Sequence, residues 1–212
     1  MTIFDLYRPF MKRFRGRRMT MFRDMIQPAE GQVILDVGGY AAFWNTSGLK
    51  NLRILCLNVH PVDMPPPGDL QIETVTGDGC TLPYPDASFD IVFSNSVIEH
   101  VGDWNRQLAF AQEARRVGKQ LWIQTPAYEF PIEPHYVAPC IHYLPKWFQR
   151  RILRWCTPWG LLQKPTRAEI DEAINTTRLL SKREMRCLFP DCEIIGEPFC
   201  CLFSKSWIAV RR

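Results

Sequence analysis

The stretch VILDVGGYAAFW, from Val33 to Trp44, carries the strongest indication of the fold. Its apolar start is typical of a buried parallel strand, and this strand reaches Asp36 just before Gly38 and Gly39. Adjacent glycines permit a tight turn and leave the backbone bare enough for a ligand to approach. In an open α/β sheet, ligands bind beyond the carboxyl ends of the strands, often at the first strand-to-helix turn. The stretch therefore predicts both an α/β fold and the place of a binding site.

Strand patterns recur along the chain, with helical patterns between them. We expect seven strands, at residues 33–37, 53–58, 71–76, 89–94, 120–124, 192–195 and 206–210. This alternation favours a Rossmann-like, mostly parallel sheet with helices on both faces. Only about ten residues join the last two strands, which is short for a right-handed crossover helix, so we expect an antiparallel last strand.

The length of 212 residues suits one domain with a large insertion. Residues 1–30 form a basic N-terminal segment, in which residues 4–26 predict one helix, or two helices broken at Gly16. Strand–helix alternation stops between residues 128 and 180, a region rich in proline and tryptophan. We expect this region to be a helical lid insertion within a single domain that spans residues 1–212.

Basic residues are concentrated in two places, although the net charge is only +4. Residues 8–23 carry seven arginines and lysines without an acid, and residues 146–154 carry four. Each stretch is either a solvated helix face or a surface that attracts an anionic partner. Tryptophans between the arginines of the second stretch suit a peripheral membrane contact as well as a packed helix. No recognised nucleic-acid-binding module accompanies them, so nucleic acid is not an expected partner.

Two further features concern location and metal binding. No apolar run reaches the ~18 residues of a membrane-spanning helix, and the N-terminus does not read as a secretory signal. We therefore expect a cytoplasmic protein, with the inner membrane face as an alternative location. The eight cysteines form no C-x-x-C pair, which favours reduced thiols. His135, Cys140, His142 and Cys156 cluster in sequence, but their spacing matches no familiar site, so we expect no metal.

Three motifs together resemble the class I S-adenosylmethionine-dependent methyltransferases, in particular the compact, single-domain, methyltransferase type 11-like bacterial members. The motifs are ILDVGG at 34–39, GDGCTLPYPDASFDIVFSNSVIEHV at 77–101 and EARRVGKQLWIQTPA at 113–127. Residues 130–151 are also similar to an insertion in bacterial members, some of them linked to cell-surface glycan synthesis. The resemblance implies S-adenosylmethionine as cofactor and methyl transfer to a small molecule or glycan, including an anionic one.

The resemblance also implies where the amino-acid and ribose ends of the cofactor bind. Asp36 would accept from the ammonium group while Gly38 and Gly39 let the backbone come close, and the structural alternative for Asp36 is a turn cap. The family has an acid at the end of the second strand for the ribose hydroxyls. Here Asn58 stands there, and Asp63 is a possible substitute on the following loop.

The residues that would bind the adenine and sulfonium parts of the cofactor lie after later strands. By resemblance, Asp78 would accept from the adenine amine, with backbone donors from Gly79 and Cys80. The structural alternative for Asp78 is an Asx-turn residue. Asn95 ends the fourth strand, where it would face the sulfonium and the methyl acceptor.

Two histidines are candidates for a catalytic base. Methyl transfer to oxygen or nitrogen is an in-line displacement that depends mainly on positioning, and a base helps when the acceptor is a hydroxyl. His100, in Glu99-His100, and His135, in Glu133-Pro134-His135, have a suitable pKa range. The alternatives are that His100 fixes the following loop and that His135 packs within the insertion.

The chain departs from the family pattern at the glycine-rich turn and at the second strand. Tyr40 and Ala42 replace the two later glycines, and Tyr40 would be strained if its φ were positive. Asn58 also lacks the charge of the family's acid. The alternative function is therefore a non-catalytic methyltransferase-fold scaffold or binding protein. A nucleotide-dependent dehydrogenase is disfavoured because the chain has neither G-x-G-x-x-G nor an acid on the second strand.

Overall fold

The computed structural model describes residues 3–62, 70–199 and 203–212. Its strands are β1 (Val33–Val37), β2 (Arg53–Asn58), β3 (Gln71–Thr76), β4 (Phe89–Asn95), β5 (Gly118–Pro126), β8 (Glu193–Phe199) and β9 (Phe203–Arg211). They form one seven-stranded sheet in the order β3-β2-β1-β4-β5-β9-β8. The neighbouring pairs among β1 to β5 are parallel, whereas β9 is antiparallel to both β5 and β8. The predicted mostly parallel sheet with an antiparallel last strand is confirmed.

The first three strands begin and end at the predicted residues, whereas β5, β8 and β9 are longer than predicted. Strand β8 continues through Gly196 and Pro198, which sequence patterns treat as breaks. It is an edge strand with a register shift between Glu197 and Pro198, and edge strands tolerate proline because one side of the backbone has no partner strand.

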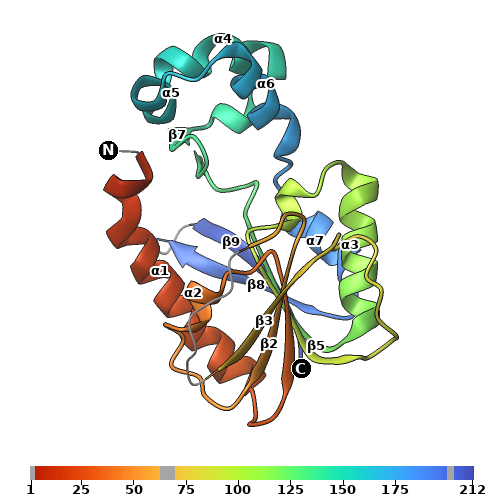
Figure 1. Cartoon of the computed structure of the whole chain (residues 1–212). Helices are drawn as coiled ribbons and strands as arrows, with labels where there is room; N and C mark the ends of the chain where they lie inside the picture. Colours follow the sequence, from red (N-terminus) through yellow and green to blue (C-terminus); the bar gives the residue numbers. More distant parts are fainter. Residues whose placement is uncertain (1–2, 63–69, 200–202) are drawn as a thin grey trace.

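Helices cover both faces of the sheet, as predicted (Figure 1). The helices α1 (Ile3–Ile26) and α2 (Ala41–Trp44) lie on one face, and α3 (Trp104–Val117) and α7 (Lys182–Leu188) on the other. Helix α1 runs unbroken through Gly16. Asp103 caps α3 by accepting from the Arg106 N–H, and Ser181 and Glu184 form a reciprocal cap of α7.

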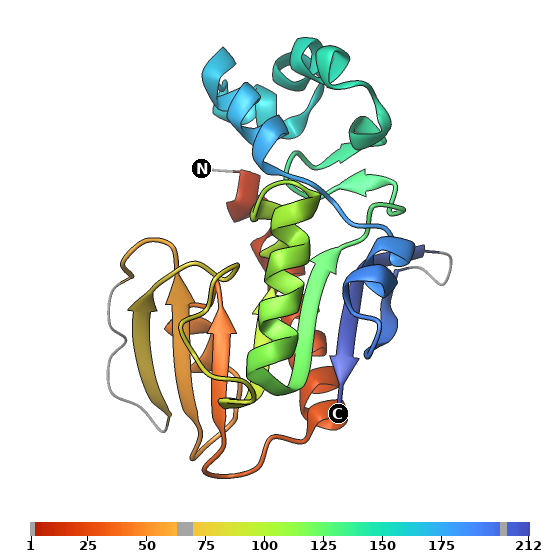
Figure 2. The same ribbon diagram turned by 90° about the vertical axis from the view of Figure 1, so that its right-hand side faces the viewer.

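Residues 128–180 pack beyond the carboxyl ends of the parallel strands (Figure 2). They contain the short hairpin β6 (Ile132–Glu133) and β7 (Ala138–Pro139), the 3-10 turn η2 (Ile141–Tyr143), and the helices α4 (Lys146–Cys156), α5 (Pro158–Gln163) and α6 (Arg167–Thr176). A small core of their own includes Tyr136, Leu153 and Ile170. We refer to residues 128–180 as the insertion.

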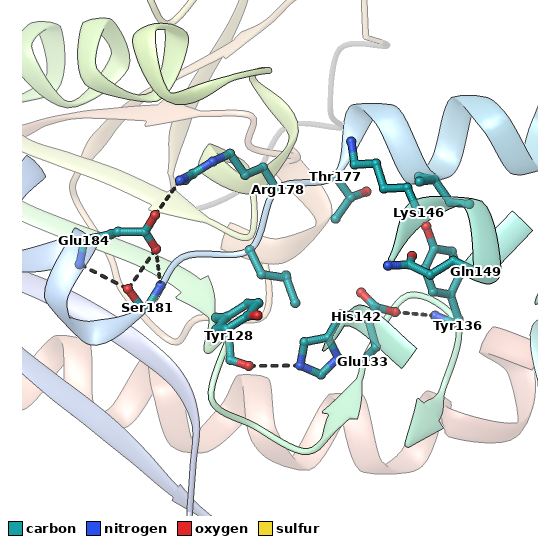
Figure 3. Close-up of a pocket in the computed structure, with 12 residues that line it drawn as sticks. Tyr128, Glu133, Tyr136, His142, Lys146, Gln149, Thr177, Arg178, Ser181 and Glu184 are labelled. Carbon is teal, nitrogen blue, oxygen red and sulfur yellow. Dashed lines mark hydrogen bonds and ion pairs between the residues drawn. The ribbon is translucent and has the colours of Figure 1, made fainter. Parts of the chain in front are cut away.

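A cavity of about 460 Å³ opens between the insertion and the start of α7 (Figure 3). Most of its lining belongs to the insertion, including Tyr128, Glu133, Lys146 and Arg178. Glu184 of α7 contributes from the main domain and forms an ion pair with Arg178. The fold thus places a partly charged hollow at the edge of the sheet where ligands of α/β proteins bind.

Helix α1 is part of the core because Phe22 is fully buried in an aromatic cluster. Its ring centroid lies 5.1 Å from that of Phe93, 5.5 Å from Trp122 and 6.1 Å from Trp44. We expect Phe22→Ala to lower the free energy of unfolding by about 3 to 5 kcal/mol, measured by urea denaturation. The exposed Asp24→Ala on the same helix should change it by no more than about 0.5 kcal/mol. Equal stability of the two variants would contradict this packing.

Candidate active site

The glycine turn after β1 is built around a buried carboxylate. Asp36 is only 2% exposed, and Trp44 Nε1–H donates to its Oδ2 at 2.6 Å. A Cβ on Gly39 would lie 1.8 Å from the same oxygen, so the carboxylate fills the space that a side chain would need. Burial raises the pKa of Asp36 to about 7, although the Trp44 hydrogen bond opposes the rise. These contacts are those of a residue that holds the turn, and a contact to a cofactor ammonium stays a prediction.

Tyr40 is not strained in this turn. Its backbone is extended, with φ −126°, and its side chain is 61% exposed. The positive φ of the turn, +79°, falls on Gly38, where a Cβ would also lie 2.3 Å from Val97. The concern that tyrosine occupies a position needing positive φ is therefore wrong, because the turn places that demand two residues earlier.

Asn58, at the end of β2, serves the same turn. Its Nδ2 donates to the carbonyl oxygen of Gly39 at 2.8 Å, which ties the end of β2 to the glycine turn. The predicted ribose contact of Asn58 is not tested by this geometry. Asp63, the substitute considered for that contact, lies outside the described residues.

Asp78 closes the loop after β3 as an Asx turn, because its Oδ1 accepts from the Cys80 N–H at 2.9 Å. Its Oδ2 accepts from Arg106 Nη2 at 2.9 Å, a contact that the sequence analysis missed. Although partial burial alone would raise it, these hydrogen bonds and the Arg106 charge hold the pKa of Asp78 below its ordinary value. The Cys80 donor is thus used within the turn, and a side chain on Gly79 would meet Val37 at 2.7 Å.

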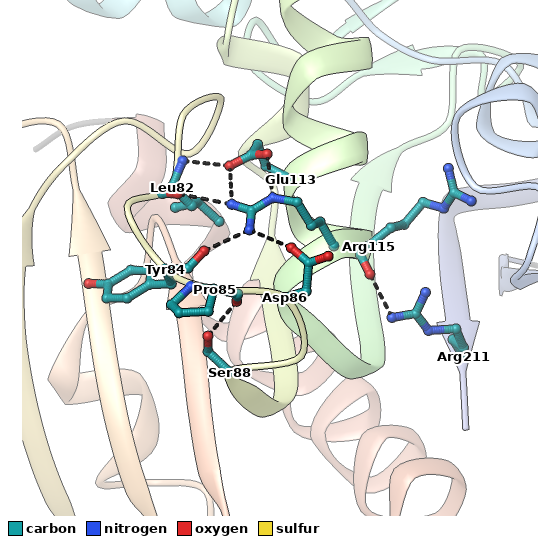
Figure 4. A network of polar contacts seen from close by, with 9 residues as sticks. Leu82, Tyr84, Pro85, Asp86, Ser88, Glu113, Arg115 and Arg211 are labelled. Carbon is teal, nitrogen blue, oxygen red and sulfur yellow. Dashed lines mark hydrogen bonds and ion pairs between the residues drawn. The ribbon is translucent and has the colours of Figure 1, made fainter.

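The segment that follows Asp78 is anchored to α3 through Leu82, Tyr84 and Asp86 (Figure 4). Arg116 donates to the carbonyl oxygens of Leu82 and Tyr84 and forms ion pairs with Asp86 and Glu113. Glu113 in turn accepts from the Leu82 N–H at 2.7 Å. Arg116 and Glu113 belong to the third sequence motif and Leu82 to Asp86 to the second. The two motifs therefore occur together because one holds the other in place.

Asn95, at the end of β4, is held by the N-terminal helix. Arg18 Nη1 donates to Asn95 Oδ1 and, at 2.9 Å, to Gln124 Oε1 at the end of β5. Gln124 Oε1 also accepts from the Ser96 hydroxyl at 3.1 Å. Arg18 comes from the first basic stretch, but it is neither a solvated residue nor one free to attract an anion.

The same arginine reaches a buried acid on the edge strand β8. Arg18 Nη2 lies 2.9 Å from Glu197 Oε2, and Lys205 Nζ lies 2.7 Å from Glu197 Oε1. Burial would raise the pKa of Glu197, but the Arg18 and Lys205 charges and the Ser206 hydroxyl lower it. Burial also lowers the pKa of Lys205 to about 8. No local sequence signal marks this pair, because its partners are 179 residues apart.

The two candidate bases meet although 35 residues separate them in the chain. His100, in the 3-10 turn η1 (Ile98–His100) after β4, has its Nε2 3.1 Å from Nε2 of His135 in the insertion. His135 Nδ1 contacts Glu133 Oε1 at 2.6 Å. Burial and the neighbouring His135 lower the pKa of His100 to about 4. Burial would also lower the pKa of His135, but the hydrogen bond and charge of Glu133 raise it.

Glu99 lies beneath this pair and is fully buried. The Thr125 hydroxyl donates to its Oε2 at 2.9 Å, whereas its Oε1 has no hydrogen-bond partner. Burial raises the pKa of Glu99 to about 7. Glu99, His100 and His135 each offer a ligand atom within 4.8 Å of the others. The metal-binding group considered from the sequence was His135, Cys140, His142 and Cys156. Among the described residues, only His135 of that set belongs to the group found in the structure. His142 Nε2 contacts the Tyr128 carbonyl oxygen instead.

Residues 46–121 match the family model described as a methyltransferase domain. This stretch contains β2 to β4, the Asp78 corner, the 3-10 turn η1 and helix α3. The match covers about a third of the chain, and the seven-stranded sheet around it has the fold of the class I S-adenosylmethionine-dependent methyltransferases. No curated protein matches the sequence closely enough to count as a relative.

Solved structures share the methyltransferase fold at low sequence identity. A protein described as a methyltransferase, in complex with the activator Trm112 of Haloferax volcanii, is 17% identical with a TM-score of 0.52, over 99% of this chain and 97% of that one. An S-adenosylmethionine-dependent methyltransferase of Methanosarcina mazei is 15% identical with a TM-score of 0.50, over 86% and 92%. A methyltransferase assigned to antibiotic biosynthesis in Anabaena variabilis is 16% identical with a TM-score of 0.52, over 90% and 71%. These likenesses concern the fold alone.

Removing the Arg18 cation should destabilise the methyltransferase fold. Breaking a buried ion pair leaves an uncompensated charge, and Glu197 would keep only Lys205. We expect Arg18→Met to lower the free energy of unfolding at pH 7 by about 2 to 4 kcal/mol in urea denaturation. Exposed Arg17→Met, the matched control on the same helix, should change it by about 0.5 kcal/mol or less.

The pH dependence of this loss follows from the lowered pKa of Glu197. An acid with a depressed folded-state pKa contributes stability above its ordinary pKa of 4.5, and that contribution is lost as the pH falls through the lowered value. The difference between wild type and Arg18→Met should therefore be constant from pH 7 to about 5 and shrink below that. A difference that grows on acidification would show that Arg18 acts on another group.

Proposed function

We propose that the chain transfers the methyl group of S-adenosylmethionine to a small-molecule or glycan acceptor. The observation that supports this most is the alignment of the glycine turn and Asp78 at one edge of a methyltransferase-fold sheet. The turn follows β1 and the Asp78 corner follows β3, so both lie at carboxyl ends of parallel strands. In α/β proteins this edge is where ligands bind.

The donors and acceptors at this edge fit most of the cofactor. The Asp78 carboxylate is partly exposed and can accept from an adenine amine, since an ionised carboxylate has about four lone-pair sites and only two contacts are used. The bare backbone at Gly39 and the acid beneath it suit the charged amino-acid end. The ribose hydroxyls have a weaker candidate partner, because Asn58 at the end of β2 is an amide and its Nδ2 already donates to the Gly39 carbonyl oxygen.

S-adenosylmethionine supplies an electrophilic methyl group on a sulfonium. The chain's own contribution is to position the acceptor and to exclude water from the edge where the two meet. Arg18, Asn95 and Gln124 form a fixed polar wall at the ends of β4 and β5. His100 and His135, from the main domain and the insertion, join across the same edge and are the candidates for contact with the acceptor.

The cavity under the insertion is the proposed acceptor site. Its volume of about 460 Å³ is that of a typical small-molecule pocket. Hydrogen-bonding groups line it, including Tyr128, His142, Gln149 and Thr177, and the cation Lys146 suits an anionic group on the acceptor (Figure 3). A polar molecule or the end of a glycan fits this lining.

Cofactor binding tests the proposal through a variant that keeps the turn. In Asp78→Asn the amide oxygen can still accept from Cys80, but an NH₂ group would face the adenine amine, donor against donor. Loss of such a charge-assisted bond costs about 1.5 to 3 kcal/mol, which is roughly a 10- to 150-fold weaker Kd. We expect this loss in calorimetric titrations with S-adenosylmethionine and S-adenosylhomocysteine.

The matched control is Asp86→Asn, the same change in the same segment at a side chain that is 81% exposed. Its cofactor affinity should equal that of the wild type. If the folded wild-type protein binds neither ligand, the methyl-transfer proposal fails and the scaffold alternative takes its place. The tie of Asn58 to the glycine turn is the observation that favours this alternative.

We also propose that α4 and α5 contact an anionic membrane surface. Among the described residues no helix is long and apolar enough to cross a membrane, so this contact would be peripheral. Trp147 and Trp155 are 61% and 68% exposed, and Arg151 and Arg154 stack on their rings. Leu161 and Leu162 of α5 are each 56% exposed. Helix α4 has four cations and no acid, a composition that suits the interface of anionic lipids.

Vesicle co-sedimentation tests this surface. The wild type should bind vesicles that contain phosphatidylglycerol and not pure phosphatidylcholine, with binding reduced by salt. We expect the double variant Trp147→Ala and Trp155→Ala to bind at least tenfold more weakly. Phe203→Ala, an exposed aromatic residue outside α4 and α5, is the control and should bind as the wild type does. Equal binding of all three proteins to both kinds of vesicle would refute the proposal.

A further inference from the structure

We infer that Glu99, His100 and His135 form a binding site for a divalent transition-metal cation at the border of the acceptor cavity. This inference rests on the proposed function, because it assigns the cation a place beside the methyl acceptor. The group unites the 3-10 turn after β4 with the insertion. Two imidazoles and one carboxylate, with further positions open, are a donor set that suits Zn²⁺ or Fe²⁺.

The two histidine rings are oriented as metal ligands are. His135 turns its Nδ1 to Glu133 at 2.6 Å, and His100 has a backbone hydrogen bond with Thr176 and its Nδ1 3.5 Å from Thr177 Oγ1. Metal-bound histidines usually hold their second nitrogen by such a carboxylate or backbone partner. Both Nε2 atoms are thereby left to face each other.

The separation of these atoms fits a shared cation. The two Nε2 atoms are 3.1 Å apart. Two nitrogens bound to one Zn²⁺ at tetrahedral angles are roughly 3.4 Å apart, given Zn–N bonds of about 2.0 to 2.1 Å. If both Nδ1 atoms carry their protons toward their partners, both Nε2 atoms present lone pairs to each other. Only a proton or a cation between the rings then relieves the repulsion.

Glu99 supplies the independent observation that favours a cation. Its side chain is fully buried and its Oε1 has no hydrogen-bond partner, which is costly for a carboxylate oxygen unless a ligand completes it. Thr125 fixes the other oxygen, so the carboxylate is held in place. The three ligand atoms lie within 4.8 Å of one another, and a contraction of roughly 1 to 1.5 Å would bring them to metal-bound separations.

The position of the group indicates what such a cation would bind. Glu133, the partner of His135, and Thr177, beside His100, both line the cavity. The open coordination positions would therefore be available to an acceptor that enters it. An oxygen donor, such as a hydroxyl or carboxylate of the acceptor, is the ligand class that this arrangement would hold, and binding to the cation would lower the pKa of a hydroxyl.

Zn²⁺ titration of the full chain, first dialysed against a chelator, tests the site by calorimetry and by metal analysis after desalting. We expect one bound Zn²⁺ per chain in the wild type. His135→Ala and Glu99→Gln should each weaken binding by more than 100-fold, and Glu133→Gln by about 10- to 100-fold. His60→Ala, an exposed histidine outside the group, should bind Zn²⁺ as the wild type does.

Two further measurements distinguish Zn²⁺ binding at Glu99, His100 and His135 from Zn²⁺ binding elsewhere on the chain. Thiolate charge-transfer absorption of the Co²⁺-loaded protein, or loss of binding in Cys140→Ser or Cys156→Ser, would place the metal on exposed cysteines and overturn the inference. A shared imidazole proton between His100 and His135 that persists in ¹⁵N NMR spectra with excess Zn²⁺ would overturn it as well.

The metal inference and the proposed function can fail separately. S-adenosylhomocysteine binding by the chelator-treated protein reports on the cofactor side, which lies on other residues. Cofactor binding without Zn²⁺ binding would remove the cation and leave the proposed function intact. Zn²⁺ binding at these residues without cofactor binding would support the metal site and would assign it to a non-catalytic methyltransferase-fold protein.

Discussion

The buried pair of Arg18 and Glu197 is the interaction that joins the most distant parts of this fold. Taking two charges out of water is expensive, and mutual attraction offsets that cost only when further hydrogen bonds complete the pair. Here Asn95 and Gln124 accept from the guanidinium, while Lys205 and Ser206 satisfy the carboxylate. The N-terminal helix is therefore locked to the ends of β4 and β5 and to the β8–β9 hairpin. This lock fixes one wall of the candidate site before any ligand binds.

The glycine turn is stabilised entirely by contacts within the chain. These contacts explain why Tyr40, where the family pattern has glycine, causes no strain. Trp44 holds the Asp36 carboxylate, that carboxylate fills the space beside Gly39, and Asn58 binds the Gly39 carbonyl oxygen. Since the extended backbone of position 40 accepts any side chain, tyrosine there leaves the turn unchanged. The same contacts reduce the number of polar groups available to a cofactor, because the groups that stabilise the turn already have partners within the chain.

Local patterns predicted the fold well and the site only in part. Strands β1 to β3 begin and end where the apolar pattern predicted, because that signal lies within a few residues of each strand. Strand β8 was longer than predicted because an edge position tolerates its glycine and proline. The contacts of Arg18 with Glu197, of Arg106 with Asp78 and of His100 with His135 are set by tertiary packing over 28 to 179 residues, and no sequence spacing reports them.

The main sheet and the insertion each contribute polar residues to the carboxyl edge of the parallel strands. Glu99 lies at the border between the main sheet and the insertion, where one of its carboxylate oxygens is buried and has no hydrogen-bond partner. The insertion places His135, which its carboxylate partner Glu133 keeps oriented, at this border, and it brings a cavity lined by polar and charged side chains to the same place. A purely structural lid would bury apolar side chains against this edge, since buried polar groups without partners cost free energy. The acid and the two imidazoles, whose ligand atoms lie within 4.8 Å of one another, are therefore the feature that packing alone does not explain.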